Sequence, residues 1–181
     1  MTEDPSGVYV GRLLVATPRL DDPNFSRSVI LLLEHGPEGA LGVILNRPSE
    51  LTVADPLPEW ASVATDPAVV FMGGPVSPGS VLALGRAGDV PGEVAGPVAL
   101  DLDGDPAGVP TLDGVRIFAG YAGWAPHQLE AEIIAGGWYV VDADPTDAFS
   151  PDPSNLWWEV LGRQEGPLSR LANFPLDPTL N

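Results

Sequence analysis

Glu34 and His35 are the adjacent residues best suited to chemistry in this chain. They end a predicted strand and stand directly before a Gly-Pro turn. An imidazole in that position could serve as a general base or a metal ligand, and the neighbouring carboxylate could orient it. The alternative is a histidine that is hydrogen-bonded to the loop backbone. This structural interpretation is favoured for a single Glu-His pair. The other histidine is His127, so a zinc-binding H-E-x-x-H motif is excluded.

Two glycine-rich segments could bring the backbone close to a ligand. Gly73 and Gly74 follow a predicted strand, where they permit either a close backbone approach or a simple turn. The segment from Gly120 to Trp124, GYAGW, stands before a predicted helix, which suits a shallow pocket presenting backbone amides to an anion. A tight strand-to-helix crossing with Trp124 in the core explains the same residues. The structural explanation is favoured for both segments.

Acidic residues form two short clusters that could hold a cation. Asp101, Asp103 and Asp105 alternate as at the start of an EF-hand loop. That loop requires glycine at its sixth position and glutamate at its twelfth, where this chain has proline and leucine. A second cluster could supply oxygen ligands but more simply caps a turn: Asp142, Asp144 and Asp147. We therefore expect neither a bound metal nor a cofactor.

The amino-acid composition excludes several classes of chemistry. The 181-residue chain has 25 acidic and 8 basic residues, which gives a formal net charge of −17. All the basic residues are arginines, and both lysine and cysteine are absent. Schiff-base lysines, P-loop lysines, disulfides and cysteine nucleophiles are therefore excluded. DNA and anionic membranes are bound through basic surfaces, so the charge disfavours direct DNA binding.

The sequence also predicts a cytoplasmic protein without membrane association. No basic segment followed by an apolar stretch opens the chain. No apolar run approaches the ~20 residues that a membrane helix needs.

The elements that must position these residues are mainly short strands. Apolar and β-branched runs bounded by Gly, Pro or Asp predict strands over 8–16, 28–34, 40–46, 68–72, 81–85, 98–102, 115–119 and 138–141. The segment at 36–39 predicts an antiparallel hairpin. Two helices are predicted, one starting at Pro126 and one capped by Asp152 with Pro153 in its first turn. Their apolar faces are Leu129, Ile133 and Ile134, and Leu156, Trp157, Val160 and Leu161.

The elements predict one α+β domain over residues 1–181, with irregular ends at about 1–7 and 175–181. We see no internal repeat and no linker long enough to separate two domains.

Taken in order, the motifs resemble those of the YqgE/AlgH family. Each piece is weak alone, but the ordered set spans nearly the whole chain and is specific. The matching residues are Leu14 to Pro18, Leu20, Asp22-Pro23, Phe25, Arg27-Ser28-Val29, Glu34-His35, Gly39-Ala40, Gly42, Asn46, Pro48, Gly73-Gly74-Pro75, Gly120 to Trp124, Gln128-Leu129-Glu130, Glu132, Gly137-Trp138, Asp142 and Asp144.

The resemblance implies a fold in which a strongly bent, mainly antiparallel sheet forms a barrel-like core with helices packed around it. It also implies a bacterial cytosolic protein without an established activity, sometimes labelled a transcriptional regulator. One departure is position 127, where the family usually has glycine and this chain has histidine. If that glycine admits a ligand or a helix, His127 places the corresponding site in doubt.

Two main functions remain open. The absence of catalytic motifs favours a non-catalytic regulatory or binding protein that contacts a protein or a small ligand. The alternative is a ligand-binding protein or enzyme with a pocket near Glu34, His35 and the segment 120–124. A structural role would instead use Trp157 and Trp158 in a homodimer. The candidate binding residues are Glu34, His35, Asn46, Gly73, Gly74, Tyr121, Trp124, Gln128 and Glu130.

Overall fold

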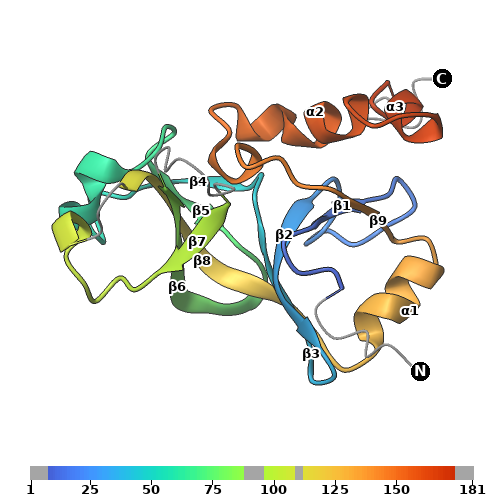
Figure 1. The fold of residues 1–181 in the computed structure, drawn as a ribbon, viewed down its shortest axis with the longest axis horizontal. Coiled ribbons are helices and arrows are strands. Elements are labelled where there is room, and N and C mark those ends of the chain that lie inside the picture. The colour runs from blue at the N-terminus through green and yellow to red at the C-terminus, as the bar shows by residue number, and fades with distance from the viewer. Residues whose placement is uncertain (1–7, 88–95, 109–111, 174–181) are drawn as a thin grey trace.

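Nine strands form one curled sheet in this computed structural model, which describes residues 8–87, 96–108 and 112–173 (Figure 1). The strand order is β4-β5-β8-β3-β2-β1-β9, and β6 pairs with both β7 and β8. Among the described residues, the named strands pair antiparallel except β5 with β8. The strands are β1 (Leu13–Ala16), β2 (Val29–Gly36), β3 (Gly39–Ile44), β4 (Pro48–Thr52), β5 (Val69–Met72), β6 (Val76–Ala87), β7 (Pro97–Leu100), β8 (Leu112–Trp124) and β9 (Trp138–Val141).

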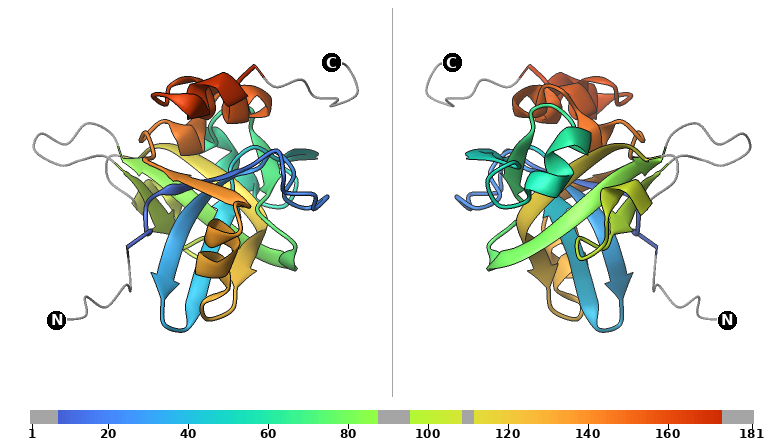
Figure 2. Two further views of the ribbon diagram at one scale, coloured as in Figure 1. Left: turned by 90° about the vertical axis from the view of Figure 1, so that its right-hand side faces the viewer. Right: turned by 90° about the vertical axis from the view of Figure 1, so that its left-hand side faces the viewer.

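The long strand β8 gives the sheet its half-barrel shape. It has 13 residues and pairs with β5 and β6 along most of its length, while its last three residues pair with β3. One strand therefore belongs to two arms: β1, β2, β3 and β9 form one, and β4, β5, β6 and β7 form the other. The arms lie on opposite sides of the molecule in Figure 1, and Figure 2 shows the molecule from the side of each arm. This confirms the expected α+β class with a strongly bent, mainly antiparallel sheet.

Helices cover two sides of this sheet. α1 (Gln128–Ile134) lies beside β3, and α2 (Leu156–Gly162) lies with α3 (Pro167–Leu171) across the other side (Figure 1). Four short 3₁₀ turns complete the described elements: η1 (Pro58–Val63), η2 (Pro106–Gly108), η3 (Asp147–Phe149) and η4 (Pro153–Asn155). No helix in the described ranges is long and apolar enough to cross a membrane.

The second predicted helix is confirmed. Asp152 occupies the N-cap of η4, although its side chain makes no capping hydrogen bond, and α2 follows. The Nε1 of Trp157 donates to the carbonyl of Ala16 at 2.9 Å. Trp157 thus belongs to the core rather than to a free surface. All four predicted apolar positions are buried: Leu156, Trp157, Val160 and Leu161.

Three other predictions need correction. The predicted strand 8–16 begins only at Leu13, because Gly11 has a φ of +78° that interrupts the extended chain. The segment 120–124 is not a loop, because it continues β8 and residues 121–124 pair with β3 and β6, although Trp124 does pack in the core as the structural explanation expects. Helix α1 begins at Gln128 rather than Pro126. Ile134 is 88% exposed, since five residues after Leu129 the helix has turned its side chain away from the core.

The strand predicted at 138–141 is confirmed as β9, and the other predicted strands are confirmed with shifted ends. The hairpin is confirmed, since Gly36 pairs with Gly39. The irregular ends predicted at 1–7 and 175–181 lie outside the described residues.

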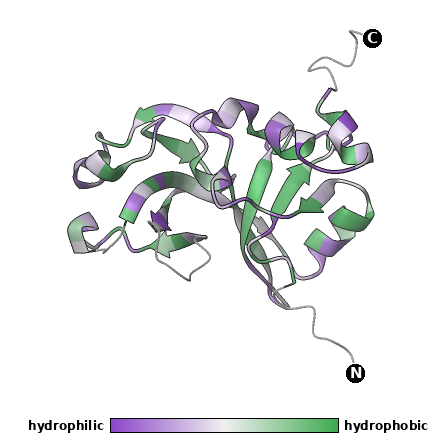
Figure 3. Ribbon diagram, turned by 45° about the horizontal axis from the view of Figure 1, so that its top comes forward, coloured by the Kyte–Doolittle hydropathy of each residue, from purple (hydrophilic) through white to green (hydrophobic). Residues whose placement is uncertain are grey.

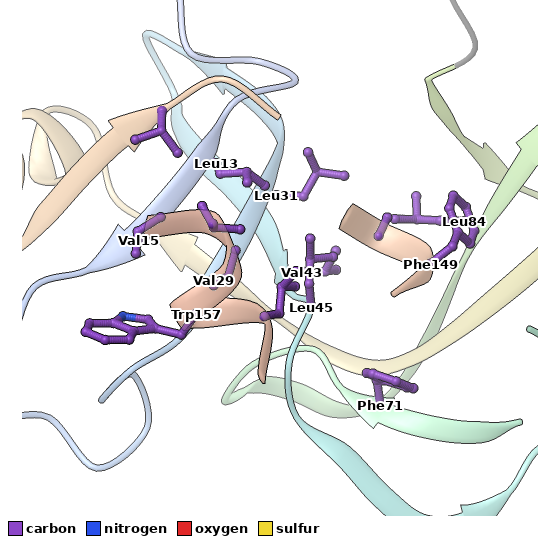
Figure 4. Packing of buried hydrophobic residues seen from close by; sticks show 14 of the residues in the cluster. Leu13, Val15, Val29, Leu31, Val43, Leu45, Phe71, Leu84, Phe149 and Trp157 are labelled. Carbon is purple, nitrogen blue, oxygen red and sulfur yellow. The ribbon is translucent and has the colours of Figure 1, made fainter. Parts of the chain in front are cut away.

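Part of the core packs between the two arms. Leu13, Leu31 and Leu45 approach from one arm, and Leu84 approaches from the other (Figure 4). Figure 3 shows hydrophobic residues concentrated in the central strands. A second cluster, which includes Trp124, Leu129 and Trp138, packs between the sheet and α1.

Candidate functional site

A β-bulge in β2 decides the directions of Glu34 and His35. The two residues pair with Leu41 and Ala40 of β3, but the register shifts by one residue after Leu32. Regular alternation would place Glu34 on the face that Leu32 occupies. With one extra residue in the strand, His35 takes that face and Glu34 takes the opposite one.

His35 is bound to the helix α1 rather than to its sequence neighbour. Its side chain is 3% exposed, and its Nε2 lies 2.7 Å from Oε1 of Glu130. The ring also contacts Tyr9, with centroids 5.1 Å apart. The pKa of Glu130 is lowered, first by the hydrogen bond to its own backbone and then by the bond with His35. The pair therefore ties the β2–β3 hairpin to α1.

The carboxylate of Glu132, also on α1, binds the side chains of two tryptophans. Oε2 of Glu132 accepts hydrogen bonds from Nε1 of Trp124 at 3.0 Å and of Trp138 at 2.9 Å. Oε1 accepts from Nε2 of Gln128, whose own Oε1 accepts from the amide of Ala125. Buried indole donors need such partners. Gln128, proposed from the sequence as a binding residue, thus holds the helix in place.

The backbone at position 127 explains why glycine suits it. His127 precedes α1 with φ 62° and ψ 0°, in the left-handed region. Glycine enters this region without steric cost, whereas other residues are strained there. The glycine usual in the resembling family is therefore accounted for by backbone conformation, with no ligand required.

Asn46, Gly73 and Gly74 also hold the backbone. Oδ1 of Asn46 accepts from the amide of Val29, and its Nδ2 donates to a neighbouring carbonyl. A Cβ on Gly73 would lie 2.3 Å from the carbonyl oxygen of Gly120, and one on Gly74 would lie 2.1 Å from the backbone of β8. These glycines permit a close crossing of two chain segments, which is the structural alternative of the sequence analysis.

The acidic clusters cap turns. Oδ1 of Asp144 accepts from both the amide and the hydroxyl of Thr146. Asp147 is buried and bound by both terminal nitrogens of Arg163. Oδ1 of Asp101 accepts from the amide two residues later. Within the described ranges, no group of three or more His, Asp or Glu side chains could hold a metal ion.

Glu34 borders a hollow on the face opposite His35. The hollow measures about 440 Å³, and Glu38, Val76, Tyr121 and Trp124 line it too. Glu34 is exposed, and no side chain in the described part of the chain forms an ion pair with it.

A deeper, mainly apolar hollow adjoins the first. It measures about 570 Å³ and lies between the arms of the half-barrel, with Leu13, Leu31, Leu45, Leu82 and Ala99 among its walls. Glu34 and Leu41 border both hollows. We call the two together the Glu34 groove.

The structure thus separates the predicted site residues. Glu34, Tyr121 and Trp124 border the groove, and the remaining six do not: His35, Asn46, Gly73, Gly74, Gln128 and Glu130. Sequence reasoning missed the apolar walls, because leucines that line a hollow have the same pattern as leucines of a strand core.

Comparison with known proteins identifies the family. A family model described as AlgH-like matches residues 13–169. The chain belongs to the AlgH-like family. Among AlgH-like relatives, a UPF0301 protein of Streptomyces coelicolor is 51% identical over 192 residues, covering 100% of this chain and 98% of the relative. A UPF0301 protein of Thermobifida fusca is 48% identical over 191 residues, covering 94% of each chain.

Solved AlgH-like structures share the fold. The crystal structure of protein DIP2367 from Corynebacterium diphtheriae has a TM-score of 0.85 and 34% identity, covering 96% of this chain and 95% of that one. The solution structure of the AlgH protein from Pseudomonas aeruginosa has a TM-score of 0.64 and 30% identity, covering 97% and 98%. The half-barrel is therefore the fold of these AlgH-like proteins also.

Proposed function

We propose that this AlgH-like protein is a non-catalytic binding protein whose site is the Glu34 groove. The observation that carries the proposal is the junction of an apolar hollow of about 570 Å³ with a carboxylate that has no ion-pair partner among the described residues. Ligand sites typically combine apolar walls with a few polar groups that fix orientation. The groove has this composition.

The acidic side chains that border the groove indicate which class of ligand it binds. Glu34, Glu38 and Asp144 border the groove, in a chain whose formal net charge is −17. Tyr121 lines the same hollow as Glu34 and offers an aromatic ring, which attracts organic cations. The ligand class is a small organic cation with an apolar body, its body between the arms and its charge at Glu34.

The position of His35 supports binding over catalysis. His35 is the residue that the sequence suggested as a general base, but it lies on the other face of the sheet and is held by Glu130. A general base must reach the proton that it removes, directly or through one water. The groove has no such access to His35.

A calorimetric titration tests the proposal with two probes of equal alkyl chain, hexyltrimethylammonium and hexyl sulfate. The wild-type protein should bind the cation more tightly than the anion. Glu34→Gln should weaken cation binding about threefold to tenfold, as expected for loss of one partly exposed charge pair. Glu50→Gln, at an exposed position on β4, is the matched control and should leave binding unchanged.

A second pair of variants tests the apolar hollow. Ala99 lines it, whereas its neighbour Val98 points to the opposite side of β7. Ala99→Trp should fill the space and weaken binding of both probes about tenfold or more, while Val98→Trp should not. Absence of saturable cation binding, or equal effects of the two tryptophans, would refute the proposal.

A further inference from the structure

A third hollow lies apart from the Glu34 groove and shares no lining residue with it. It measures about 540 Å³ and lies between the end of η1, the strands β6 and β8, and the segment after η3. Ser62, Thr65, Arg86, Asp113 and Phe149 are among its walls.

Two arginines lie on one face of the strands at this hollow. Arg116 of β8 pairs with Leu84 of β6, and Arg86 follows Leu84 by two residues. Residues paired across strands, and residues two apart along a strand, share a face. Arg86 therefore lines the hollow, and Arg116 lies diagonally beside it on the same face.

Arg116 is a buried cation without a carboxylate partner in the described part of the chain. It is 1% exposed, and its terminal nitrogens donate to the carbonyls of Ser150 at 2.9 Å and Asp66 at 2.8 Å. Burial lowers its pKa to about 10, with Arg86 acting in the same direction and Asp66 in the opposite one. A buried charge without a counter-ion is costly, so an anion close by would stabilise it.

Polar atoms around the hollow have hydrogen-bonding capacity left. Among the buried side-chain atoms of the described residues that lack a hydrogen-bond partner, three lie at or beside this hollow: Oγ1 of Thr65, Nε of Arg86 and Nε of Arg116. Nε of Arg86 lies 3.3 Å from Oδ2 of Asp113 as an ion pair without hydrogen-bond alignment. The Asp113 side chain is 64% exposed, so it can move away from Arg86 when another anion arrives.

Gly114 leaves room for two of these groups to meet. A Cβ at this position would lie 2.4 Å from Oγ1 of Thr65 and 3.6 Å from Nη2 of Arg86. Residue 114 therefore places no side chain between the threonine hydroxyl and the guanidinium, which leaves room for one small group to contact both.

We propose that this hollow binds the oxyanion group, phosphate or carboxylate, of a small ligand. Arg86 donates two parallel hydrogen bonds from its planar guanidinium, as arginine does with both kinds of group. The hydroxyl of Thr65 donates a third. The buried charge of Arg116 attracts the anion from behind, and Asp113 is the internal carboxylate that the ligand displaces.

Titrations with sodium phosphate and with sodium acetate, each compared with sodium chloride at equal ionic strength, test this site. Calorimetry and chemical-shift changes in NMR spectra report binding. Saturable binding of phosphate alone supports a phosphorylated ligand, and saturable binding of acetate alone supports a carboxylate ligand. Binding of neither by the wild type and by Asp113→Asn refutes the site.

Three variants and a control make the test specific. Arg86→Gln and Thr65→Val should each weaken binding about fivefold or more, because each removes a donor. Asp113→Asn should tighten binding, because it removes the competing carboxylate. Arg12→Gln, which breaks a surface ion pair with Asp142, should change nothing. Equal losses in Arg12→Gln and Arg86→Gln, or weaker binding by Asp113→Asn, would overturn the proposal.

Discussion

The hydrogen bond between His35 of β2 and Glu130 of α1 joins two residues that lie 95 positions apart in the sequence. Glu34, the adjacent acid, would be the natural partner from sequence alone. The bulge in β2 separates the two side chains onto opposite faces, and α1 supplies the carboxylate instead. A residue's neighbour in the sequence is thus a poor guide to its chemical partner wherever a strand changes register.

This bond predicts a pH effect on stability. Folding lowers the pKa of Glu130 below its usual value of 4.5. The carboxylate therefore stabilises the fold above that value, and the stabilisation is lost as pH falls through the lowered pKa. The difference in free energy of unfolding between wild type and Glu130→Gln should be fully present above about pH 4.5 and should shrink as the pH falls below this value.

Urea unfolding at several pH values measures this difference, with Glu50→Gln on β4 as the control. A difference that grows as the pH falls would contradict the assignment.

The left-handed backbone at His127 predicts opposite effects of two substitutions. His127→Gly should raise the free energy of unfolding by about 1 kcal/mol, because glycine is not strained at φ 62°. His127→Val should lower it by about 1 kcal/mol or more, because a β-branched residue is strained further. Denaturant unfolding of the three proteins measures the order of their free energies of unfolding. A valine variant as stable as the glycine variant would contradict the prediction, because it would show that the backbone before α1 shifts to relieve the strain.

At the scale of elements, local signals predicted local structure. The hairpin and α2 each have their turn residues, prolines and apolar spacing within a short stretch, and both were predicted correctly. The strand β8 was cut short in prediction because Gly120 and Gly123 are typical of a turn. In the structure β3 pairs with Gly123, and β6 pairs with the residues on either side of Gly120. The Glu34 groove could not be predicted for the same reason, since its walls meet only when the two arms curl together.

The crossing of Gly74 over β8 predicts a strong steric effect. Gly74→Ala should lower the free energy of unfolding by about 3 kcal/mol, because the new Cβ would meet backbone atoms of Tyr121 that cannot turn aside. Gly79→Ala is the matched control, since no atom lies within 4 Å of a Cβ there. Thermal and urea unfolding would measure both, and similar losses in the two variants would contradict the crossing as the cause.

At the scale of the whole molecule, the arginines are placed unfavourably for nucleic acid. Arg12, Arg86 and Arg163 are in ion pairs with aspartates, and Arg116 is buried. Arg47 donates to the carbonyl of Ser26, and Arg27 lies over the rings of Trp157 and Trp158. Six of the eight arginines are therefore engaged within the described part of the chain. The remaining cations lie on a molecule with a formal net charge of −17, so long-range electrostatics oppose approach to DNA.

This charge distribution predicts no binding to duplex DNA at physiological salt. Fluorescence anisotropy with labelled random-sequence DNA should show no saturable change, because too few phosphates can be neutralised. Lowering the salt concentration should not rescue binding, since repulsion is then less screened. A saturable complex at physiological salt would restore a direct role in transcription.

The bulge in β2 also sets where the chain can change in length. Leu33 is the extra residue, because Leu32 and Glu34 pair with consecutive residues of β3. A relative lacking one residue at this point would form a regular strand and still present Glu34 and His35 to the same two faces. A deletion elsewhere in β2, for example at Ile30, would shift the buried positions that precede it onto the wrong faces. Insertions and deletions among relatives should therefore collect at position 33 and avoid the rest of this strand.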